Sequence, residues 1–536
     1  MSNRRLALAG LLAAVTCTAC SHASPPPAHV LRIADWSEPS SLNPLLARDQ
    51  DTIGFDLLFA QTLIGLSAGN KLVPVLVTRV PSRENGDISD DGRNIVYHLR
   101  PGIRFADGHV LTSRDVAFTY RAIMDPRNPV LSSDAYRRIA SLTTPDDRTV
   151  VVRLRSPWNA AVRELFAQSD FAFGILPAHA FVSTVLQHAS WEEHAFGTGP
   201  FRVTQWRRGD RVILERNPFY APKPKLERIE LRLIPDLNGV VVALRAGEAD
   251  VARLTAVQVP QAAAIPGMRV IPTPINGADY LTLQTTAPPT DDVRVRHAIA
   301  DATNLEEIEK AFHRLNPLAG AFLPPVLEWH DAALLPVAEN GRAAGAELDA
   351  AGWRLQGGVR AKNGAPLEVL IVSQTGLSGE FTAIVQRELA AVGIRATIKS
   401  FPAQIFNGPD GPLRTGHFNI ASQGWIGGAD PEQSITFACS QIGPNGNNIA
   451  RFCDKEFERA FADQAVTPDQ RRRAADFRAM QRIVYDRLPV ISVDYIRFFD
   501  AVSNRVSGFA RNMLGFPVNA ENWDVYSFGL SIQAFA

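Results

Sequence analysis

The strongest constraint on the fold is a strand–helix–strand unit in the second half of the chain. Residues 367–372 have the pattern of a buried strand, residues 381–392 that of a helix ended by Gly393, and residues 394–398 that of a second strand. A glycine just past a helix readily takes the left-handed conformation that stops it. Strands joined through a helix lie parallel in one sheet. Strands and helices alternate in the first half as well, so the sequence predicts an α/β fold with two lobes.

Further elements are expected on either side of this unit. A hydroxyl at residue 112 or 113 can cap a helix at residues 116–123, and alternating β-branched residues predict a strand at residues 149–154. Residues 293–312 show one long helical pattern, and residues 467–470 form a capping box that opens another helix. Because 536 residues are too many for one compact core, two or three subdomains are expected.

The N-terminus has the pattern of an export signal. Arg4 and Arg5 precede an uncharged apolar run at residues 6–15, and small residues follow up to Cys20. The run is too short for a membrane-spanning helix, which needs about 20 apolar residues. Ala19-Cys20 resembles a bacterial lipoprotein cleavage site, at which Cys20 becomes the lipidated first residue; cleavage after residue 23 is the alternative. Residues 1–27 are then leader and tether, and a periplasmic protein held to the membrane by lipid alone is expected.

Two cysteines lie beyond the leader, Cys439 and Cys453. An exported chain meets an oxidising compartment, in which two close cysteines usually pair. The segment between them is rich in Gly, Asn and Pro, which predicts a loop that a disulfide would close. The alternative is two buried free thiols. A metal site is disfavoured, because neither cysteine has a second ligand at Cys-x-x-Cys spacing.

Charge and motifs argue against nucleic-acid binding and against catalysis. Lys+Arg and Asp+Glu both total 55, so the formal net charge is zero, and no basic run is interleaved with aromatic residues. The sequence contains neither a His-Glu-x-x-His zinc motif nor a Gly-rich phosphate loop. Residues 65–69 match the Gly-x-Ser-x-Gly nucleophile elbow around Ser67, but the elbow needs a helix directly after the serine, and residues 70–74 do not begin one. We therefore expect no catalytic residue, no cofactor and no metal.

A series of short motifs runs through the chain in a fixed order. Leu-Asn-Pro stands at residues 42–44, Arg-Phe-Ala-Asp-Gly at 104–108 and Leu-Thr-Ser-Arg-Asp-Val-Ala-Phe at 111–118. Further motifs lie at residues 197–201, 215–220, 244–250, 292–299, 350–353 and 389–394. Together they resemble the bacterial extracellular solute-binding proteins of family 5, the oligopeptide, dipeptide and nickel type, and the likeness covers nearly the whole processed chain.

The resemblance implies a periplasmic-binding-protein-like fold of class II, in the large type with an extra subdomain in lobe I. The bounds it suggests are residues 28–62, 197–276 and 494–536 for lobe I, residues 63–196 for the extra subdomain and residues 277–493 for lobe II. It implies that a peptide, a peptide-like solute or another small polar solute is captured between lobes that close about a hinge near residues 273–284 and 490–496. The implied partners are the permease and ATPase subunits of an ABC transporter, and the protein would be a monomer.

The resemblance also points to a ligand region around Trp425, whose indole offers a rigid face for packing a solute. Peptide-binding members hold the free amine on an Asp three residues after this Trp, where this chain has Gly428; the nearest acid is Asp430. Dipeptide members place an Arg for the carboxylate just after the first strand of the parallel unit, where this chain has Ser373 and Gln374. Free-ended dipeptides are therefore not expected as preferred solutes, unless Asp430 takes over the amine.

Two other functions stay open at the level of the sequence. One is an exported hydrolase that uses Ser67, and the other is a surface adhesin or chaperone-like binder on the same fold. Permease and ATPase genes beside this one would favour transport, whereas an activity lost in Ser67→Ala would favour the hydrolase.

Overall fold

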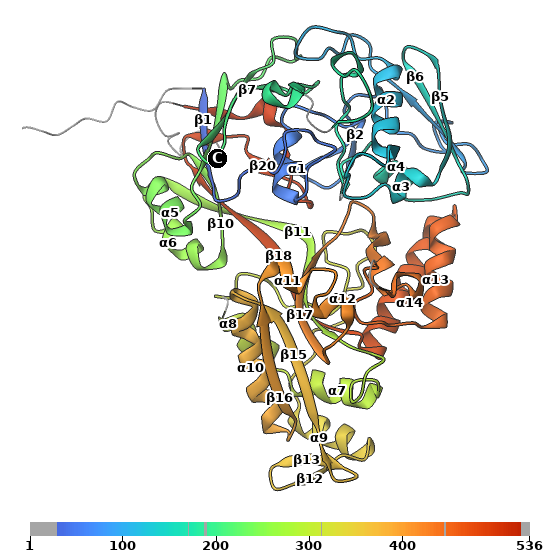
Figure 1. Ribbon diagram of the computed structural model, residues 1–536, viewed down its shortest axis with the longest axis vertical. Coiled ribbons are helices and arrows are strands. Elements are labelled where there is room, and N and C mark those ends of the chain that lie inside the picture. Colours follow the sequence, from blue (N-terminus) through green and yellow to red (C-terminus); the bar gives the residue numbers. More distant parts are fainter. Residues whose placement is uncertain (1–28, 170, 187–189, 312, 444–445, 527–536) are drawn as a thin grey trace, which may run out of the picture.

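One mixed sheet of ten strands runs through the whole molecule, in the order β16-β15-β17-β11-β18-β10-β1-β9-β8-β7. The computed structural model describes residues 29–169, 171–186, 190–311, 313–443 and 446–526. Figure 1 shows an upper and a lower half joined by the long strands β11 (Met268–Leu283) and β18 (Val490–Ser503), which pair antiparallel. The fold is α/β with two lobes, as the sequence predicts.

The upper half is built around β1, which pairs parallel with β9 on one side and with β10 on the other. Its elements are β1 (Val30–Asp35), α1 (Gln50–Asp56), β2 (Ile64–Leu66), β3 (Leu72–Pro74), β4 (Asn94–His98), α2 (Ser113–Met124), α3 (Asp134–Arg137), β5 (Ile139–Asp146), β6 (Thr149–Leu154), α4 (Ala161–Glu164), η1 (Ala178–Ala180), η2 (Ser190–His194), β7 (Phe201–Arg207), β8 (Arg211–Arg216), β9 (Arg228–Leu233), α5 (Leu237–Arg245), β10 (Val251–Leu254), η3 (Ala256–Gln258) and α6 (Val259–Ala263).

Within the upper half, a separate three-stranded sheet, β4-β6-β5, packs against α2. Every second residue of β6 is buried, which is the period of a strand with one face on the core. Helix α2 begins where the sequence predicts a cap, since the side chain of Asp115 accepts hydrogen bonds from the backbone N–H and the hydroxyl of Thr112.

The C-terminal segment returns to the upper half after β18. Its elements are β19 (Val506–Ser507), β20 (Ala510–Arg511), β21 (Pro517–Val518), η6 (Ala520–Asn522) and β22 (Asp524–Val525). The backbone N–H of His29 donates to the carbonyl oxygen of Val525 (2.9 Å), so the first described residue lies beside β22 in this half.

The lower half contains the parallel unit that the sequence predicts: β15 pairs parallel with β16 and with β17, and α10 connects β15 to β16. After α10, Gly393 takes φ +85°, the left-handed conformation expected of it. The elements of this half are α7 (Val293–Ala302), α8 (Leu305–Ala311), α9 (Gly341–Ala350), β12 (Arg354–Gln356), β13 (Val359–Lys362), β14 (Ala365–Pro366), β15 (Glu368–Gln374), α10 (Leu377–Ala391), β16 (Arg395–Phe401), α11 (Ala403–Phe406), α12 (Pro412–Thr415), β17 (Ile420–Ile426), η4 (Pro431–Phe437), η5 (Cys439–Gln441), α13 (Lys455–Val466) and α14 (Gln470–Arg487).

Two local predictions in this half are wrong. The helical pattern at residues 293–312 is broken into α7 and α8 at Thr303 and Asn304, where the Asn304 side chain accepts from the backbone N–H of Glu307. The capping box at residues 467–470 does not form: Asp469 caps α14 by accepting from the backbone of residues 471 and 472, and Thr467 ends α13 instead. In both cases a short polar side chain offers the backbone a hydrogen bond that competes with a continuous or earlier-starting helix.

Each half has hydrophobic clusters of its own, and a further one joins them. This bridging cluster takes Ile53, Leu57 and Phe516 from the upper half and Phe322, Phe437, Phe457 and Phe477 from the lower half. The two halves are therefore in apolar contact along part of their boundary. Among the described helices, none combines the length and the apolar composition that a membrane crossing requires.

Candidate functional site

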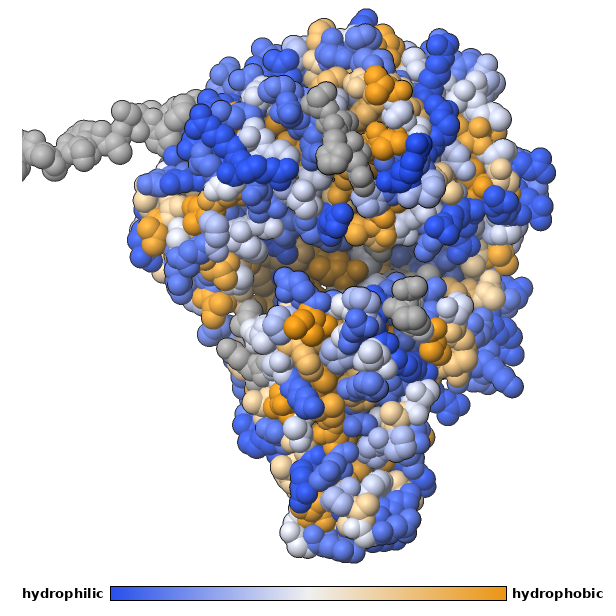
Figure 2. Space-filling view, viewed as in Figure 1, coloured by the Kyte–Doolittle hydropathy of each residue, from blue (hydrophilic) through white to orange (hydrophobic). Residues whose placement is uncertain are grey.

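A cavity of about 280 Å³ lies between the two halves, beside the connecting strands. The surface is visibly hollowed between the upper and lower halves in Figure 2. The cavity takes walls from the upper half, from β11 and β18, and from the lower half; they include Trp36, Arg253, Asp279, Ile308, Asn316, Phe381, Asp494, Arg497 and Phe498. A molecule bound here would touch both halves and both connecting strands.

Two aspartates face each other in this cavity. Asp279 on β11 and Asp494 on β18 are register partners across the antiparallel pair, and Asp494 is only 8% exposed. Burial raises the pKa of both carboxyls, and the charge of Asp279 raises that of Asp494 further. Asn316 Nδ2 donates to Asp494 Oδ1 at 3.3 Å. Near neutral pH, the pair therefore shares a proton.

The upper wall of the cavity carries a cation that is already compensated. The guanidinium carbon of Arg253 lies 3.6 Å from the ring centroid of Phe498 and 5.8 Å from that of Trp36. Arg253 also pairs with the carboxylate of Asp51. This side of the cavity thus offers aromatic surface and little uncompensated positive charge from Arg253.

Trp425 lies near the C-terminal end of β17 and borders a second, much smaller cavity of about 20 Å³. Its neighbours there include Tyr280, Gln423 and Phe437. The indole Nε1 of Trp425 is buried and has no acceptor among the described residues. Buried donors are nearly always satisfied, so an unsatisfied one beside a cavity is what a solute acceptor or a water would complete.

Asp430 is not open to either cavity. Its side chain is fully buried, with Oδ1 2.7 Å from Arg473 Nη2 and Oδ2 3.7 Å from Arg163 Nε. Ser373 is also buried, and its hydroxyl lies 3.0 Å from that of Ser400. Gln374 ends β15 and is partly exposed. Of the four ligand-binding residues suggested by the sequence, Trp425 and Gln374 have accessible surface, and Asp430 and Ser373 are engaged within the protein.

Asp430 belongs instead to a polar contact between the halves, here called the clasp. Trp158 Nε1 donates to Glu432 Oε2 at 2.7 Å, and Asn159 Nδ2 donates to the carbonyl oxygens of Gln464 (2.7 Å) and Thr467 (2.6 Å). Burial raises the pKa of Glu432 to about 7, and the neighbouring Asp430 adds to this rise. The clasp comprises Trp158, Asn159 and Arg163 above and Asp430, Glu432, Gln464 and Thr467 below.

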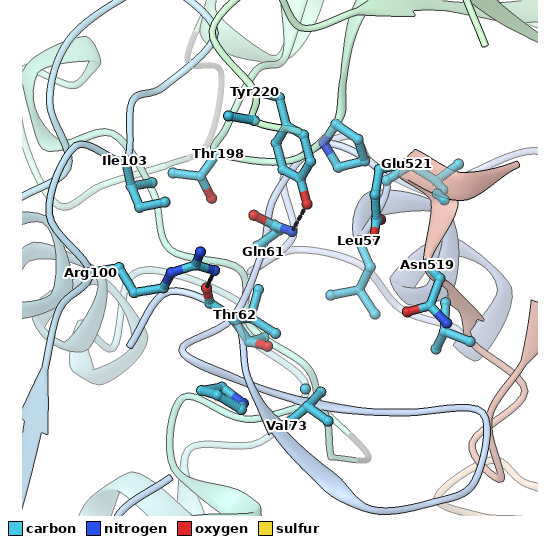
Figure 3. Close-up of a pocket in the computed structure, with 18 of the residues that line it drawn as sticks. Leu57, Gln61, Thr62, Val73, Arg100, Ile103, Thr198, Tyr220, Asn519 and Glu521 are labelled. Atoms are coloured by element: carbon cyan, nitrogen blue, oxygen red, sulfur yellow. Dashed lines mark hydrogen bonds between the residues drawn. The ribbon is translucent and has the colours of Figure 1, made fainter. Parts of the chain in front are cut away.

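A third cavity, of about 290 Å³, lies within the upper half alone. Figure 3 shows Arg100 and Glu521 on opposite sides of Gln61 and Tyr220, and Gln61 Nε2 donates to the Tyr220 hydroxyl at 3.3 Å. All the described residues that line it belong to the upper half. A change in the angle between the halves would therefore leave it unaffected, which separates it from the cavity beside Asp279.

The serine-hydrolase motif has no catalytic surroundings. Ser67 follows β2 in a tight turn that leads to β3, and its Oγ accepts from the backbone N–H of Lys71 at 3.2 Å. A nucleophile elbow requires a helix after the serine, and a hairpin stands there instead. The structure therefore agrees with the interpretation of residues 65–69 as a surface turn.

Cys439 and Cys453 are joined by a disulfide in the structure, with their Cα atoms 4.8 Å apart. The enclosed segment includes Asn447, Ile449 and Ala450, which border the small cavity beside Trp425. The disulfide thus closes a loop that forms part of the wall of this small cavity. Residues 1–28, in which the sequence predicts a leader and lipidation at Cys20, lie outside the described residues.

Sequence reasoning missed Asp279 and Asp494. The signal available was a single acid inside each of two otherwise apolar runs, Ala-Asp-Tyr-Leu at residues 278–281 and Val-Asp-Tyr-Ile at residues 493–496. A charged residue in a buried strand is costly unless something compensates it. That the two would be register partners could be known only from the pairing of distant strands.

Comparison with known proteins identifies the family and the fold that this chain resembles. Residues 71–445 match the model of the bacterial extracellular solute-binding proteins, family 5. The chain is 27% identical over 475 residues to di/tripeptide-binding protein 2 of Pseudomonas aeruginosa, covering 81% of this chain and 85% of that protein. It is 26% identical over 491 residues to the glutathione-binding protein GsiB of Shigella boydii, covering 89% and 91%. The crystal structure of NikA from Brucella suis in complex with Fe(III)-EDTA superposes with a TM-score of 0.82 at 20% identity, covering 93% and 100%.

Proposed function

Because this chain belongs to family 5 of the bacterial extracellular solute-binding proteins, we propose that it captures a peptide-like or other small polar solute between its lobes and delivers it to an ABC-transporter permease. The family consists of binding components of such transporters and not of enzymes. The ATPase subunit would be the second partner, and the binding protein itself would act as a monomer. We assign residues 28–62, 197–276 and 494–536 to lobe I, residues 63–196 to its extra subdomain and residues 277–493 to lobe II.

The observation that carries this proposal is the cavity with walls from both halves and from β11 and β18. A solute that contacts both lobes binds the closed form better than the open form, and so shifts the population toward closure. A closed, loaded protein is a state that a permease can distinguish from an empty one. No such coupling is available to the cavity of Figure 3, whose walls belong to the upper half.

The acid pair suggests the chemistry of the solute. Asp279 and Asp494 lie side by side in a partly buried cavity. Without a ligand, a bound proton relieves the repulsion between their negative charges. A basic nitrogen on the solute would replace that proton and gain a charge-assisted hydrogen bond. Trp36, Phe381 and Phe498 would pack the apolar part. We therefore propose a small solute with one basic nitrogen in this cavity. Trp425 borders the separate cavity of about 20 Å³, and we propose it as an independent ligand contact through its indole N–H, which has no acceptor among the described residues.

Ordinary free-ended dipeptides are not the preferred solutes in this proposal. The position that holds the amine in peptide-binding relatives is Gly428 here, and the nearest acid, Asp430, is paired with Arg473. The position of the carboxylate-binding arginine has Ser373, which is buried, and Gln374. At that position, a solute carboxylate would lose its hydration without a fixed cation to compensate it.

Calorimetric titration of ligand-stripped protein tests the proposal with three matched solute series: free-ended dipeptides, the same peptides with an amidated C-terminus, and the same peptides with an acetylated N-terminus. We expect the amidated series to bind best and the acetylated series to bind least. The amine dependence should vanish when Asp279 and Asp494 are both replaced with Asn, and it should persist in Asp430→Asn. Tight binding of free-ended dipeptides that is lost in Asp430→Asn would refute this assignment, and mass spectrometry of solute co-purified from the native host would check it independently.

We further propose that the protein is exported to the periplasm and anchored there by lipid on Cys20. The support is the sequence of residues 1–20, with its basic start, short apolar run and Ala19-Cys20 end. Replacing Cys20 with Ser should move the protein from the membrane fraction to the soluble periplasmic fraction. A wild-type protein that is already soluble and begins near Ser24 would show that the leader is cleaved after Ala23 instead.

A further inference from the structure

We propose that Asp107, His109 and His179 form a binding site for a divalent transition-metal ion such as Zn²⁺ or Ni²⁺ on the upper half. His109 Nδ1 lies 3.0 Å from Asp107 Oδ2, and His179 Nε2 lies 2.6 Å from the same oxygen. One donor atom from each of the three side chains lies within 4.8 Å of the other two. None of the three residues borders the cavity between the halves.

The first two ligands are placed by a tight turn. The backbone N–H of Gly108 donates to the carbonyl oxygen of Phe105 (2.9 Å), and Gly108 takes φ +95°, a conformation that favours glycine. The backbone N–H of His109 donates to Asp107 Oδ1 at 3.0 Å. One carboxylate oxygen is thus held by the backbone, and the other, Oδ2, is directed at the two imidazoles.

The third ligand comes from a segment 72 residues further along the chain. His179 lies in η1, whose start is held by a hydrogen bond from the backbone N–H of Ala178 to Asp115 Oδ1 (2.9 Å). The His179 ring packs edge-on against the fully buried ring of Phe105, with centroids 5.6 Å apart. The imidazoles of His109 and His179 stack with centroids 3.9 Å apart. Because both segments are fixed independently, little ordering is needed when an ion binds.

The donor set is the one that borderline divalent ions prefer. Two imidazole nitrogens and one carboxylate oxygen bind Zn²⁺ at about 2.0–2.2 Å, and the same set suits Ni²⁺ and Co²⁺. The side chain of His109 is 63% exposed, and those of Asp107 and His179 are 28% and 30% exposed. Solvent can therefore complete the coordination sphere. Hydrogen bonds from two neutral imidazoles to Asp107 would also hold this arrangement, and such a cluster would take up no ion.

Metal titration separates the two possibilities. The processed chain without an affinity tag is stripped with chelator and titrated with ZnCl₂ and NiCl₂ by calorimetry, and the bound metal is counted after dialysis. We expect one ion per chain with a micromolar dissociation constant, and at least a ~10-fold loss of affinity in His109→Ala. His109 is the most exposed of the three ligands, so this variant should keep the fold. Co²⁺ bound at the same site should give visible absorption bands that the variant lacks.

The matched control is His98→Ala in the same half. His98 also approaches a carboxylate, with Nε2 3.2 Å from Asp87 Oδ1, but no second imidazole completes a cluster there among the described residues. This variant should bind the ion as the wild type does. Asp107→Asn keeps an oxygen that accepts hydrogen bonds and loses the charge, so it should also weaken metal binding. Absence of binding in the wild type, or binding retained in both His109→Ala and His179→Ala, would overturn the proposal.

Discussion

Asp279 and Asp494 make the stability of this protein depend on pH. The unfolded chain ionises these carboxyls near pH 4, whereas in the folded chain burial and mutual repulsion raise the pKa of both. Between the unfolded and folded pKa values, the folded state holds more protons than the unfolded state. The free energy of unfolding contributed by this pair is therefore greatest at low pH and decreases as pH rises through the folded pKa values.

Replacing Asp494 with Asn should remove much of this dependence, because the amide stays neutral and can still donate to Asp279. For one proton, the slope of the free energy of unfolding against pH should decrease in magnitude by at most ~1.4 kcal/mol per pH unit. Urea denaturation of both proteins without ligand at pH 5, 6, 7 and 8 measures it. Other carboxyls with raised pKa, such as Glu388 and Glu432, are present in both proteins and cancel in the comparison. Parallel slopes would contradict the assignment of a shared proton to this pair.

The disulfide between Cys439 and Cys453 supports a second prediction. Closing a loop of this length lowers the entropy of the unfolded chain, which corresponds to about 3 kcal/mol of stability. The double replacement of both cysteines with Ser should lower the free energy of unfolding by that amount. It should also weaken the proposed solute contact of Trp425, since residues of this loop border the cavity beside that side chain. Thiol counting on unreduced, denatured wild type should find neither cysteine free, and two reactive thiols would rule the disulfide out.

At the scale of secondary structure, the strand–helix–strand unit was predictable because its signals are local. The predicted strand, helix and strand at residues 367–372, 381–392 and 394–398 correspond to β15, α10 and β16 within a few residues. The break between α7 and α8 was not predicted, because the apolar period continues through it and only the side chain of Asn304 marks the boundary. Periodicity reports which face is buried and is insensitive to a single capping residue.

The candidate site was predictable only in part. Trp425 could be predicted as a ligand contact from the resemblance to the family, and its unsatisfied indole N–H is consistent with that role. Asp430 is the nearest acid in sequence, yet its partner Arg473 lies on α14, and nothing local to residue 430 reveals that ion pair. Asp279 and Asp494 come from strands more than 200 residues apart, so their pairing depends on the whole topology.

The clasp supports a prediction about η4 and the segment before α4, which meet across the boundary between the halves. Trp158→Phe removes the hydrogen bond to Glu432 and keeps most of the aromatic surface. Above pH 7, where Glu432 is ionised, loss of the hydrogen bond to its carboxylate is expected to destabilise the closed form by about 1.5–3 kcal/mol, and solute affinity should fall accordingly. Trp206→Phe is the matched control, because Trp206 Nε1 donates to Glu38 Oε1 (3.0 Å) within the upper half. Equal affinity in Trp158→Phe and wild type would show that the clasp does not contribute to closure.

For the whole molecule, closure about β11 and β18 predicts a change in overall size. A solute that contacts both halves stabilises the closed form, so small-angle scattering should give a smaller radius of gyration at saturating ligand. The same measurement on Trp158→Phe without ligand should give a larger radius than the wild type without ligand. An unchanged radius in every state would mean that the two halves do not move relative to each other.

The place where the chain enters the fold has a mechanical consequence. Residue 29 is hydrogen-bonded to Val525 in the upper half, and only β11 and β18 carry the described chain from that half to the lower one. A membrane tether attached before residue 29 therefore exerts its force on the upper half alone. The upper half is then the anchored part of the molecule, and the lower half, connected to it by two strands, is the part that moves. Tension on the tether would reorient the whole molecule without straining the hinge strands. The solute affinity would therefore be the same for tethered and freely diffusing molecules.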